Sequence, residues 1–150
     1  MTESERAISA LVYRYCERID TGDFAGVAAL FEHGVWFMTK EAGSGAAPVR
    51  RWLDENIILY DGLPHTKHVT TNVVVRVDEP AGTADATAYI MILQAVTGFP
   101  LQPIFCGRYV DTFERVGGIW RWRERGCIPD LYGDMSRHIR LPPPPGPAAH

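Results

Sequence analysis

The chain has 150 residues, of which 46% are hydrophobic and 22% are charged, and its formal net charge is −3. This length and composition suit one globular domain with a buried core, and the charge balance provides no basic field for nucleic acid or an anionic membrane. No apolar run is long enough for a transmembrane helix. The first residues, MTESERAISA, lack the basic and apolar regions of a signal peptide.

Cysteines and short motifs further narrow the classes of protein to consider. Cys16, Cys106 and Cys127 are an odd number and have no CxxC spacing, which favours a reducing cytoplasm over a disulfide framework or a zinc site. GxGxxG, GxxxxGK, GxSxG and HExxH do not occur. We therefore predict a cytoplasmic protein that uses no cofactor and binds no metal.

The first part of the chain has the periodicity of helices. A first helix has one apolar stripe and ends at Gly22. Asp23 predicts the cap of a second helix, a short strand follows at residues 34–38, and EAGSGAAP predicts a flexible loop. Pro48 suits the first turn of a third amphipathic helix. The stripe of the first helix consists of Ile8, Leu11, Val12, Tyr15 and Ile19.

After Pro64 the pattern changes to long strands, which we predict at residues 68–78, 83–97, 104–116 and 119–128. Three helices ahead of a meander indicate an α+β fold. We expect a curled, mostly antiparallel sheet that packs on the helices as a conical barrel with an open pocket at one end. Residues 1–141 form the predicted domain, and the proline-rich residues 142–150 form an extended tail.

The pattern of side chains in the strand at 68–78 indicates that one of its faces lines a cavity. Alternation places one set of side chains on one face and an almost purely apolar set on the other. The mixed face is polar at its start, as expected for a strand that lines a pocket. That face comprises His68, Thr70, Asn72, Val74 and Arg76.

Three segments together resemble the SnoaL-like branch of the nuclear transport factor 2-like superfamily. They are YRYCERIDTGDFAGVAALFEHGVWF, HVTTNVVV and GRYVDTFERVGGIWRWRERGCIPD, and the resemblance covers about residues 4 to 138. It implies a conical barrel around a deep apolar pocket. The superfamily includes dehydratases, a dehydrochlorinase, polyketide cyclases, ketosteroid isomerases, epoxide hydrolases and non-catalytic subunits, so the fold alone does not determine the reaction.

The resemblance implies that Asp20, at the end of the first helix, orients His68 as a catalytic base. By position alone Asp20 could equally be a turn residue. A carboxylate that accepts a hydrogen bond from one imidazole nitrogen fixes the tautomer and raises the basicity of the other nitrogen. We therefore predict a hydrogen bond between the two side chains. His65 is a weaker alternative base, and His33 and His138 are weaker still.

Other polar residues are candidates for the site. Tyr15 is either a packed core residue or a buried phenol that binds a substrate oxygen. In the strand 104–116, alternation puts Arg108 on one face and Tyr109 and Asp111 on the other, and it does not decide which face lines the pocket. Arg108 would anchor an anion, whereas Tyr109 or Asp111 would act as an acid. Sheet-surface or interface charges are the alternative for Arg108 and Asp111.

Apolar and aromatic residues complete the predicted site. We expect Trp36, Trp52, Tyr132 and Met135 to contact substrate. The apolar spacing in residues 130–141 predicts a short helix or an ordered lid over the pocket mouth. The outer surface of the sheet, with its alternating apolar and charged residues, predicts a homodimer or homotrimer.

These features predict an enzyme in which His68 removes a proton from a small, mostly apolar cyclic substrate of polyketide, terpenoid or steroid type. Elimination by a lyase is the favoured outcome, and isomerisation or cyclisation would use the same base. The alternative is a non-catalytic ligand-binding or assembly subunit. An open pocket of a few hundred Å³ at His68 would favour the enzyme, and a cone filled by Trp and Phe would favour the subunit.

Overall fold

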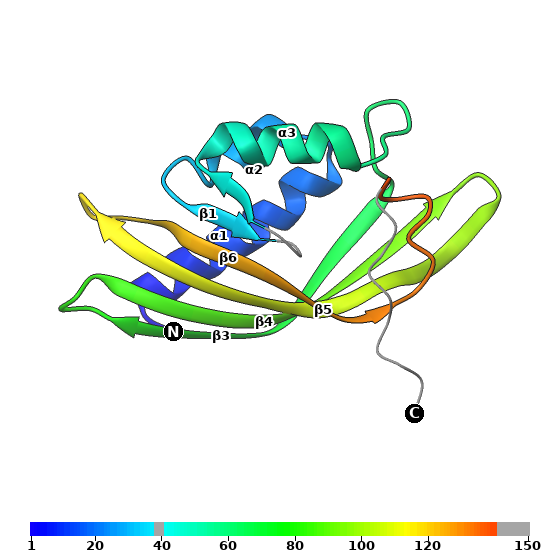
Figure 1. The fold of residues 1–150 in the computed structure, drawn as a ribbon. Helices are drawn as coiled ribbons and strands as arrows, with labels where there is room; N and C mark the ends of the chain where they lie inside the picture. Colours follow the sequence, from blue (N-terminus) through cyan, green and yellow to red (C-terminus); the bar gives the residue numbers. More distant parts are fainter. Residues whose placement is uncertain (38–40, 141–150) are drawn as a thin grey trace.

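The computed structural model describes residues 1–37 and 41–140 (Figure 1). Three helices lie on one side of a curled sheet, which confirms the predicted α+β fold. The predicted proline-rich tail lies outside the described residues. The helices are α1 (Glu3–Asp20), α2 (Phe24–Ala29) and α3 (Ala46–Asn56), and the strands are β1 (Val35–Phe37), β2 (Glu41–Ser44), β3 (Thr66–Asp78), β4 (Thr83–Val96), β5 (Phe99–Val116) and β6 (Ile119–Tyr132).

The six strands form one mixed sheet in the order β2-β1-β6-β5-β4-β3. All neighbours are antiparallel except β1 and β6. The sheet curls without closing, because its edge strands β2 and β3 do not pair with each other. The predicted flexible loop is wrong for residues 41–44, which pair with β1.

Local signals in the sequence fix both ends of α1. The Thr2 hydroxyl accepts from the Glu5 backbone N–H at 3.1 Å, and the Glu5 carboxylate accepts from the Thr2 backbone N–H at 2.6 Å, which is a capping box. Gly22 then takes a φ of 74°. A Cβ at this position would collide with the carbonyl oxygen of Gly62. The turn after α1 therefore requires glycine, and it brings the end of the helix against the segment that leads into β3.

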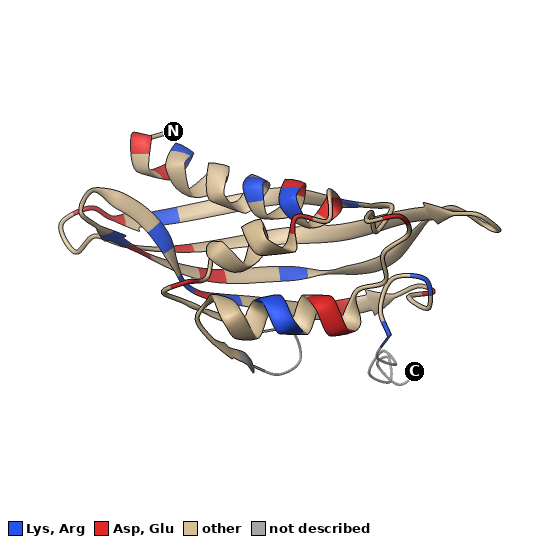
Figure 2. Cartoon of the chain, turned by 90° about the horizontal axis from the view of Figure 1, so that it is seen from above, with Lys and Arg blue, Asp and Glu red and all other residues tan. Residues whose placement is uncertain are grey.

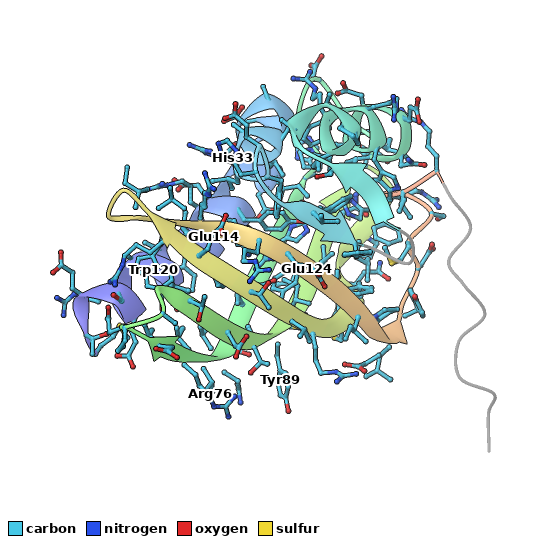
Figure 3. The ribbon with its side chains drawn as sticks, turned by 60° about the vertical axis from the view of Figure 1, so that its left-hand side comes forward. His33, Arg76, Tyr89, Glu114, Trp120 and Glu124 are labelled. Carbon is cyan, nitrogen blue, oxygen red and sulfur yellow. The ribbon has the colours of Figure 1, made fainter. Side chains whose placement is uncertain are left out.

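A bulge in β3 changes which side chains face the helices. Thr71 pairs with Tyr89 and Val74 with Thr87, so β3 has one extra residue between these pairs. Asn72 in this stretch has a φ of 53°. A bulge reverses the alternation of the residues beyond it. The prediction that His68 shares a face with Val74 and Arg76 is therefore wrong, and Arg76 points away from the helices (Figure 3). Val73, Val75 and Val77, which belong to the apolar set, pack on the core as that set predicts.

Aromatic rings fill one end of the cone. The Trp122 ring is stacked on Phe31 with 5.0 Å between centroids, and its centroid lies 5.2 Å from that of Phe113. All three side chains are completely buried. This part of the interior is therefore closed to a ligand, and any cavity must lie toward the other end.

The face of the sheet opposite the helices combines exposed apolar side chains with paired charges. Tyr89 is 57% exposed and points away from the sheet (Figure 3). Beside it, Arg108 donates to Asp130 at 2.9 Å. Positive and negative residues are interspersed over the helices and strands (Figure 2). In the described part of the chain, no helix is long and apolar enough to cross a membrane.

We expect the chain to form a homodimer or homotrimer through this outer face of the sheet. Tyr89→Asp and Leu131→Asp should weaken the assembly, because each places a charge in an apolar contact. Tyr13→Asp is the matched control, since Tyr13 is an aromatic residue of α1 that is 52% exposed. Light scattering at micromolar concentration measures the mass. A monomeric wild-type protein would contradict the prediction.

Candidate active site

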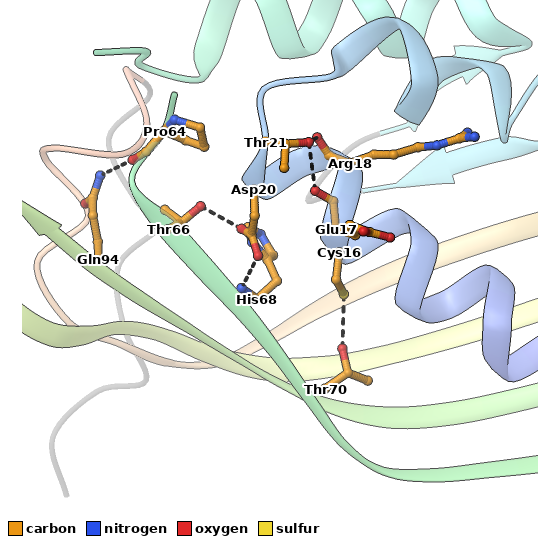
Figure 4. Close-up of polar contacts among 10 residues, drawn as sticks. All are labelled: Cys16, Glu17, Arg18, Asp20, Thr21, Pro64, Thr66, His68, Thr70 and Gln94. Carbon is orange, nitrogen blue, oxygen red and sulfur yellow. Dashed lines mark hydrogen bonds and ion pairs between the residues drawn. The ribbon is translucent and has the colours of Figure 1, made fainter. Parts of the chain in front are cut away.

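Asp20 and His68 form the buried polar pair at the centre of the candidate site. The Nδ1 atom of His68 donates to Oδ1 of Asp20 at 2.6 Å, and the two side chains are 4% and 9% exposed. Oδ1 also accepts from the Thr66 hydroxyl, and Oδ2 accepts from the backbone N–H of His68, both at 2.8 Å. Figure 4 shows these contacts. The predicted hydrogen bond between Asp20 and His68 is confirmed.

Matching periodicities in α1 and β3 bring the pair together. Cys16 and Asp20 are four residues apart and share one face of α1, and His68 and Thr70 are two apart and share one face of β3. The Cys16 sulfur lies 3.1 Å from the Thr70 hydroxyl, so two contacts join the helix to the strand. Because β3 is an edge strand, the backbone N–H of His68 needs a partner from outside the sheet, and Asp20 supplies it.

The surroundings of Asp20 keep it ionised. Burial raises the pKa of its carboxyl, but hydrogen bonds from the ring and backbone of His68 and from Thr66 outweigh burial and lower it below its usual value. An ionised carboxylate can only accept hydrogen bonds. His68 therefore carries a proton on Nδ1, and Nε2 is the nitrogen left for a ligand.

His68 lines a mainly apolar cavity between the helices and the sheet. The cavity has a volume of about 30 Å³, which is room for one or two waters. This is smaller than the open pocket of a few hundred Å³ that we expected, so a cyclic substrate must displace lining side chains. The cavity is lined by Tyr15, Ile19, Trp36, Trp52, Leu53, Ile57, His68, Ile90, Ile92, Phe105, Tyr109, Cys127, Met135, His138 and Ile139.

Five of the other predicted site residues lie at this cavity: Tyr15, Trp36, Trp52, Tyr109 and Met135. Tyr15 and Tyr109 come from α1 and β5, and their rings meet edge to face with 5.9 Å between centroids. Burial raises the pKa of both phenols. Both hydroxyls are therefore neutral hydrogen-bond donors at neutral pH.

Three residues that we predicted to contact substrate do not line this cavity. Arg108 lies on the outer face of the sheet, where it pairs with Asp130, because the other face of β5 points inward. Asp111 is on that inner face, but both of its carboxylate oxygens bind Arg125, at 2.9 and 2.7 Å. Tyr132 packs against Phe105 with 5.7 Å between ring centroids and is not among the residues that line the cavity.

The sequence patterns did not reveal the role of Arg125, which lies fully buried behind the two tyrosines. Its guanidinium carbon is 4.4 Å from the centroid of the Tyr15 ring and 3.7 Å from that of Tyr109. Burial lowers the pKa of Arg125, but the charge and hydrogen bonds of Asp111 raise it more, so the group stays charged. In the sequence RWRER, residues 121–125, alternation does not show that Arg125 is buried.

The C-terminal segment closes one side of the cavity. Strand β6 continues to Tyr132, beyond the predicted end at residue 128, and the segment that follows has one turn, at residues 136–138. The predicted short helix is therefore wrong. The segment is nevertheless ordered: Ile139 pairs with Ile57 as an isolated bridge, and Met135 and Ile139 line the cavity.

His138 is the site residue that sequence analysis ranked too low. Its side chain is buried, and its ring centroid lies 6.1 Å from that of His68. Its Nδ1 atom has no hydrogen-bond partner among the described residues. The available signal was its place between Met135 and Ile139 in a segment too apolar for a disordered end.

His65 and His33, the other candidate bases, are exposed and do not line the cavity. Within residues 1–37 and 41–140, no group of three His, Cys, Asp or Glu residues could hold a metal ion. Chemistry without a metal or cofactor stays a prediction.

A family model described as a SnoaL-like domain matches residues 1–126. Among solved structures, Rv3472 from Mycobacterium tuberculosis, of unknown function, is 25% identical with a TM-score of 0.68, over 83% of this chain and 70% of that one. A proposed scytalone dehydratase from Novosphingobium aromaticivorans is 20% identical with a TM-score of 0.70, over 97% and 95% of the two chains.

From the same organism, the beta subunit of a proposed aromatic-ring-hydroxylating dioxygenase is 18% identical with a TM-score of 0.69, over 87% of this chain and 91% of that one. No curated protein sequence matches the chain. At these identities the solved structures show a shared fold, and that fold occurs both in a protein assigned to catalysis and in a subunit of a larger enzyme.

The buried His138 should make stability depend on pH. Burial and the neighbouring charge of His68 lower the pKa of His138 to about 3, although the Asp20 carboxylate acts in the opposite direction. Between about pH 6.5 and 3 the unfolded chain then binds the extra proton, so the free energy of unfolding falls as pH falls, by up to ~1.4 kcal/mol per pH unit.

His138→Leu should reduce the loss of unfolding free energy at low pH. His33→Leu, at an exposed position, should leave that loss unchanged. Denaturant unfolding at several pH values in this window measures the difference. Parallel pH curves for wild type and His138→Leu would contradict the prediction.

Proposed function

The chain belongs to the SnoaL-like domain family, and from this premise we propose that it is a cofactor-independent acid–base enzyme whose base is His68. Its substrate would be a small, mostly apolar cyclic compound of polyketide, terpenoid or steroid type. The observation that carries the proposal is a buried histidine with one nitrogen fixed by a carboxylate and the other left for an apolar cavity. Such a combination of hydrophobic walls and few polar groups is typical of small-molecule sites.

In this proposal, Nε2 of His68 takes a proton from a carbon atom of the substrate. The imidazolium that forms is stabilised by Asp20, which stays ionised and holds the ring in place. Positioned general bases of this kind contribute about 10²–10⁴-fold to the rate. Because little water fits in the cavity, the attraction between the imidazolium and the carboxylate is stronger than in bulk solvent.

Tyr15 and Tyr109 supply the complementary electrophilic groups. Both are neutral phenols at the cavity wall, so either can donate to a substrate carbonyl or to a departing hydroxyl. The Arg125 cation against their rings opposes the effect of burial on their pKa, which strengthens them as donors. Elimination of water is the favoured reaction, as in a dehydratase, and isomerisation or cyclisation would use the same groups.

A non-catalytic ligand-binding or assembly subunit is the second candidate function. The small cavity volume favours it, because a cone filled by Trp36, Trp52 and Phe105 leaves little room for substrate. The likeness to the beta subunit of a proposed dioxygenase supports it at the level of fold. A subunit of this kind gains nothing from an oriented imidazole, so the pair of Asp20 and His68 favours the enzyme.

Replacing the base should abolish turnover. His68→Ala should lower kcat by about 10²–10⁴-fold without loss of the fold, and Asp20→Asn should also lower kcat, because the amide does not fix the tautomer. The assay follows hydroxy-ketones of alicyclic, terpenoid and polyketide type by absorbance and mass spectrometry. His65→Ala, at an exposed loop position, is the control and should keep wild-type activity. Turnover retained in His68→Ala would refute the proposed base.

Ligand binding separates the enzyme from an assembly subunit, whereas a ligand-binding subunit would bind the compound without turning it over. A compound that enters the cavity contacts Trp36 and Trp52, so it should quench tryptophan fluorescence. At a concentration of 100 times Kd, it should also stabilise the fold by about 2.7 kcal/mol. Leu53→Trp should fill the cavity and reduce both effects. Failure of every compound in the panel to bind would favour the assembly subunit.

A further inference from the structure

His138 is a polar residue in an apolar wall, and its burial requires an explanation. The side chain is 3% exposed, and its Nδ1 atom has no hydrogen-bond partner among the described residues. A buried polar atom left without a partner costs about 1–3 kcal/mol. Leucine or phenylalanine would fill the same place at no such cost. The unsatisfied nitrogen therefore indicates a partner that residues 1–37 and 41–140 do not provide.

The ring of His138 is held in place by the segments around it. The His138 carbonyl accepts from the Ile58 backbone N–H at 2.9 Å, and its backbone N–H donates to the Met135 carbonyl at 3.0 Å. The preceding carbonyl, of Arg137, accepts from the Tyr60 hydroxyl at 2.7 Å and from Nε2 of Gln94 at 3.0 Å. These contacts fix the backbone on both sides of the ring, as a preformed binding group requires.

Gln94 also connects the two histidines. Its Nε2 donates to the Pro64 carbonyl at 3.1 Å (Figure 4) as well as to Arg137. Pro64 precedes β3, which carries His68, and Arg137 precedes His138. A single buried side chain therefore holds together the two segments whose histidines line the same cavity.

We propose that His138 is a substrate-binding residue whose free ring nitrogen hydrogen-bonds a hydroxyl or carbonyl oxygen of the ligand, beside the group on which His68 acts. This inference rests on the proposed function in treating the cavity as a ligand site, and it adds the substrate class. The ligand is a cyclic ketone or alcohol with an oxygen close to the reacting carbon. A pure hydrocarbon would leave the nitrogen unsatisfied.

The electrostatic surroundings disfavour an anionic group at this position. Burial lowers the pKa of His138 far below neutral pH, so the ring is uncharged when it binds. The charged groups that act on the pKa of His138 are His68, when protonated, and the Asp20 carboxylate. A carboxylate or phosphate on the ligand would meet Asp20 without a compensating cation, whereas a neutral oxygen suits either tautomer of His138.

The chain also offers an internal contrast. His65 is exposed, and its ring faces Tyr60 with 6.0 Å between centroids. His65 is therefore a histidine close to the site that does not line the cavity. His138 lies beyond residues 1–126, which match the family model. The binding role that we propose for it is therefore carried by a segment outside the matched residues.

Matched ligand pairs test the proposal by calorimetry. The pairs are cyclohexanone with cyclohexane, and 1-tetralone and 1-tetralol with tetralin. The wild-type protein should bind the oxygenated member of a pair about 5- to 100-fold more tightly. His138→Phe should lose this preference, His138→Gln should restore part of it, and His65→Phe should retain it. In protein with ¹⁵N-labelled histidine, the oxygenated ligand should shift the ring ¹⁵N resonance of His138.

A preference for oxygen that survives in His138→Phe would overturn the proposal, as would a wild-type protein with no preference in any pair. The His138→Gln variant keeps the test decisive if His138→Phe does not fold. Failure of this inference is distinguishable from failure of the proposed function. The first is a loss of oxygen discrimination that does not depend on His138, and the second is turnover that persists in His68→Ala.

Discussion

The arrangement of the end of α1 and the start of β3 depends on the carboxylate of Asp20. It lies at the last residue of α1 and accepts three hydrogen bonds from the first residues of β3. One satisfies a backbone N–H at the open edge of the sheet, and another fixes the imidazole of His68. The same side chain therefore docks the first helix on the sheet and orients the candidate base. Packing and chemistry are coupled here, because loss of the carboxylate would leave both donors buried without a partner.

The buried ion pair of Arg125 and Asp111 lies behind the cavity wall that Tyr15 and Tyr109 form. A buried ion pair is tolerated only when its geometry is good and its charges are hydrogen-bonded, and here Arg125 donates to both carboxylate oxygens. On one side lie the packed rings around Trp122, and on the other the phenols of Tyr15 and Tyr109. The cation thus lies behind two neutral donors of the cavity wall, and it is not itself among the residues that line the cavity.

Much of this organisation could be predicted from local patterns. Apolar stripes and caps fixed the positions of the helices, and runs of β-branched residues fixed the long strands. The pairing of Asp20 with His68 came from the resemblance together with the chemistry of the two side chains. Patterns of this kind are local, because they depend on backbone periodicity and on residues within a few positions of one another.

The sequence by itself therefore determined the α+β class and the order of the three helices and four long strands, and its resemblance to the family pointed to the two residues of the central pair. Only the tertiary structure decided which face of β5 lies inside, where β3 bulges, that residues 41–44 form a strand, and that His138 folds back beside His68. An alternating strand has two candidate faces, and the helices that cover one of them are distant in the sequence. The position of a bulge depends on the partner strand. The cavity itself exists only where α1, α3, the sheet and the C-terminal segment meet, so no single segment could reveal its lining or its small volume.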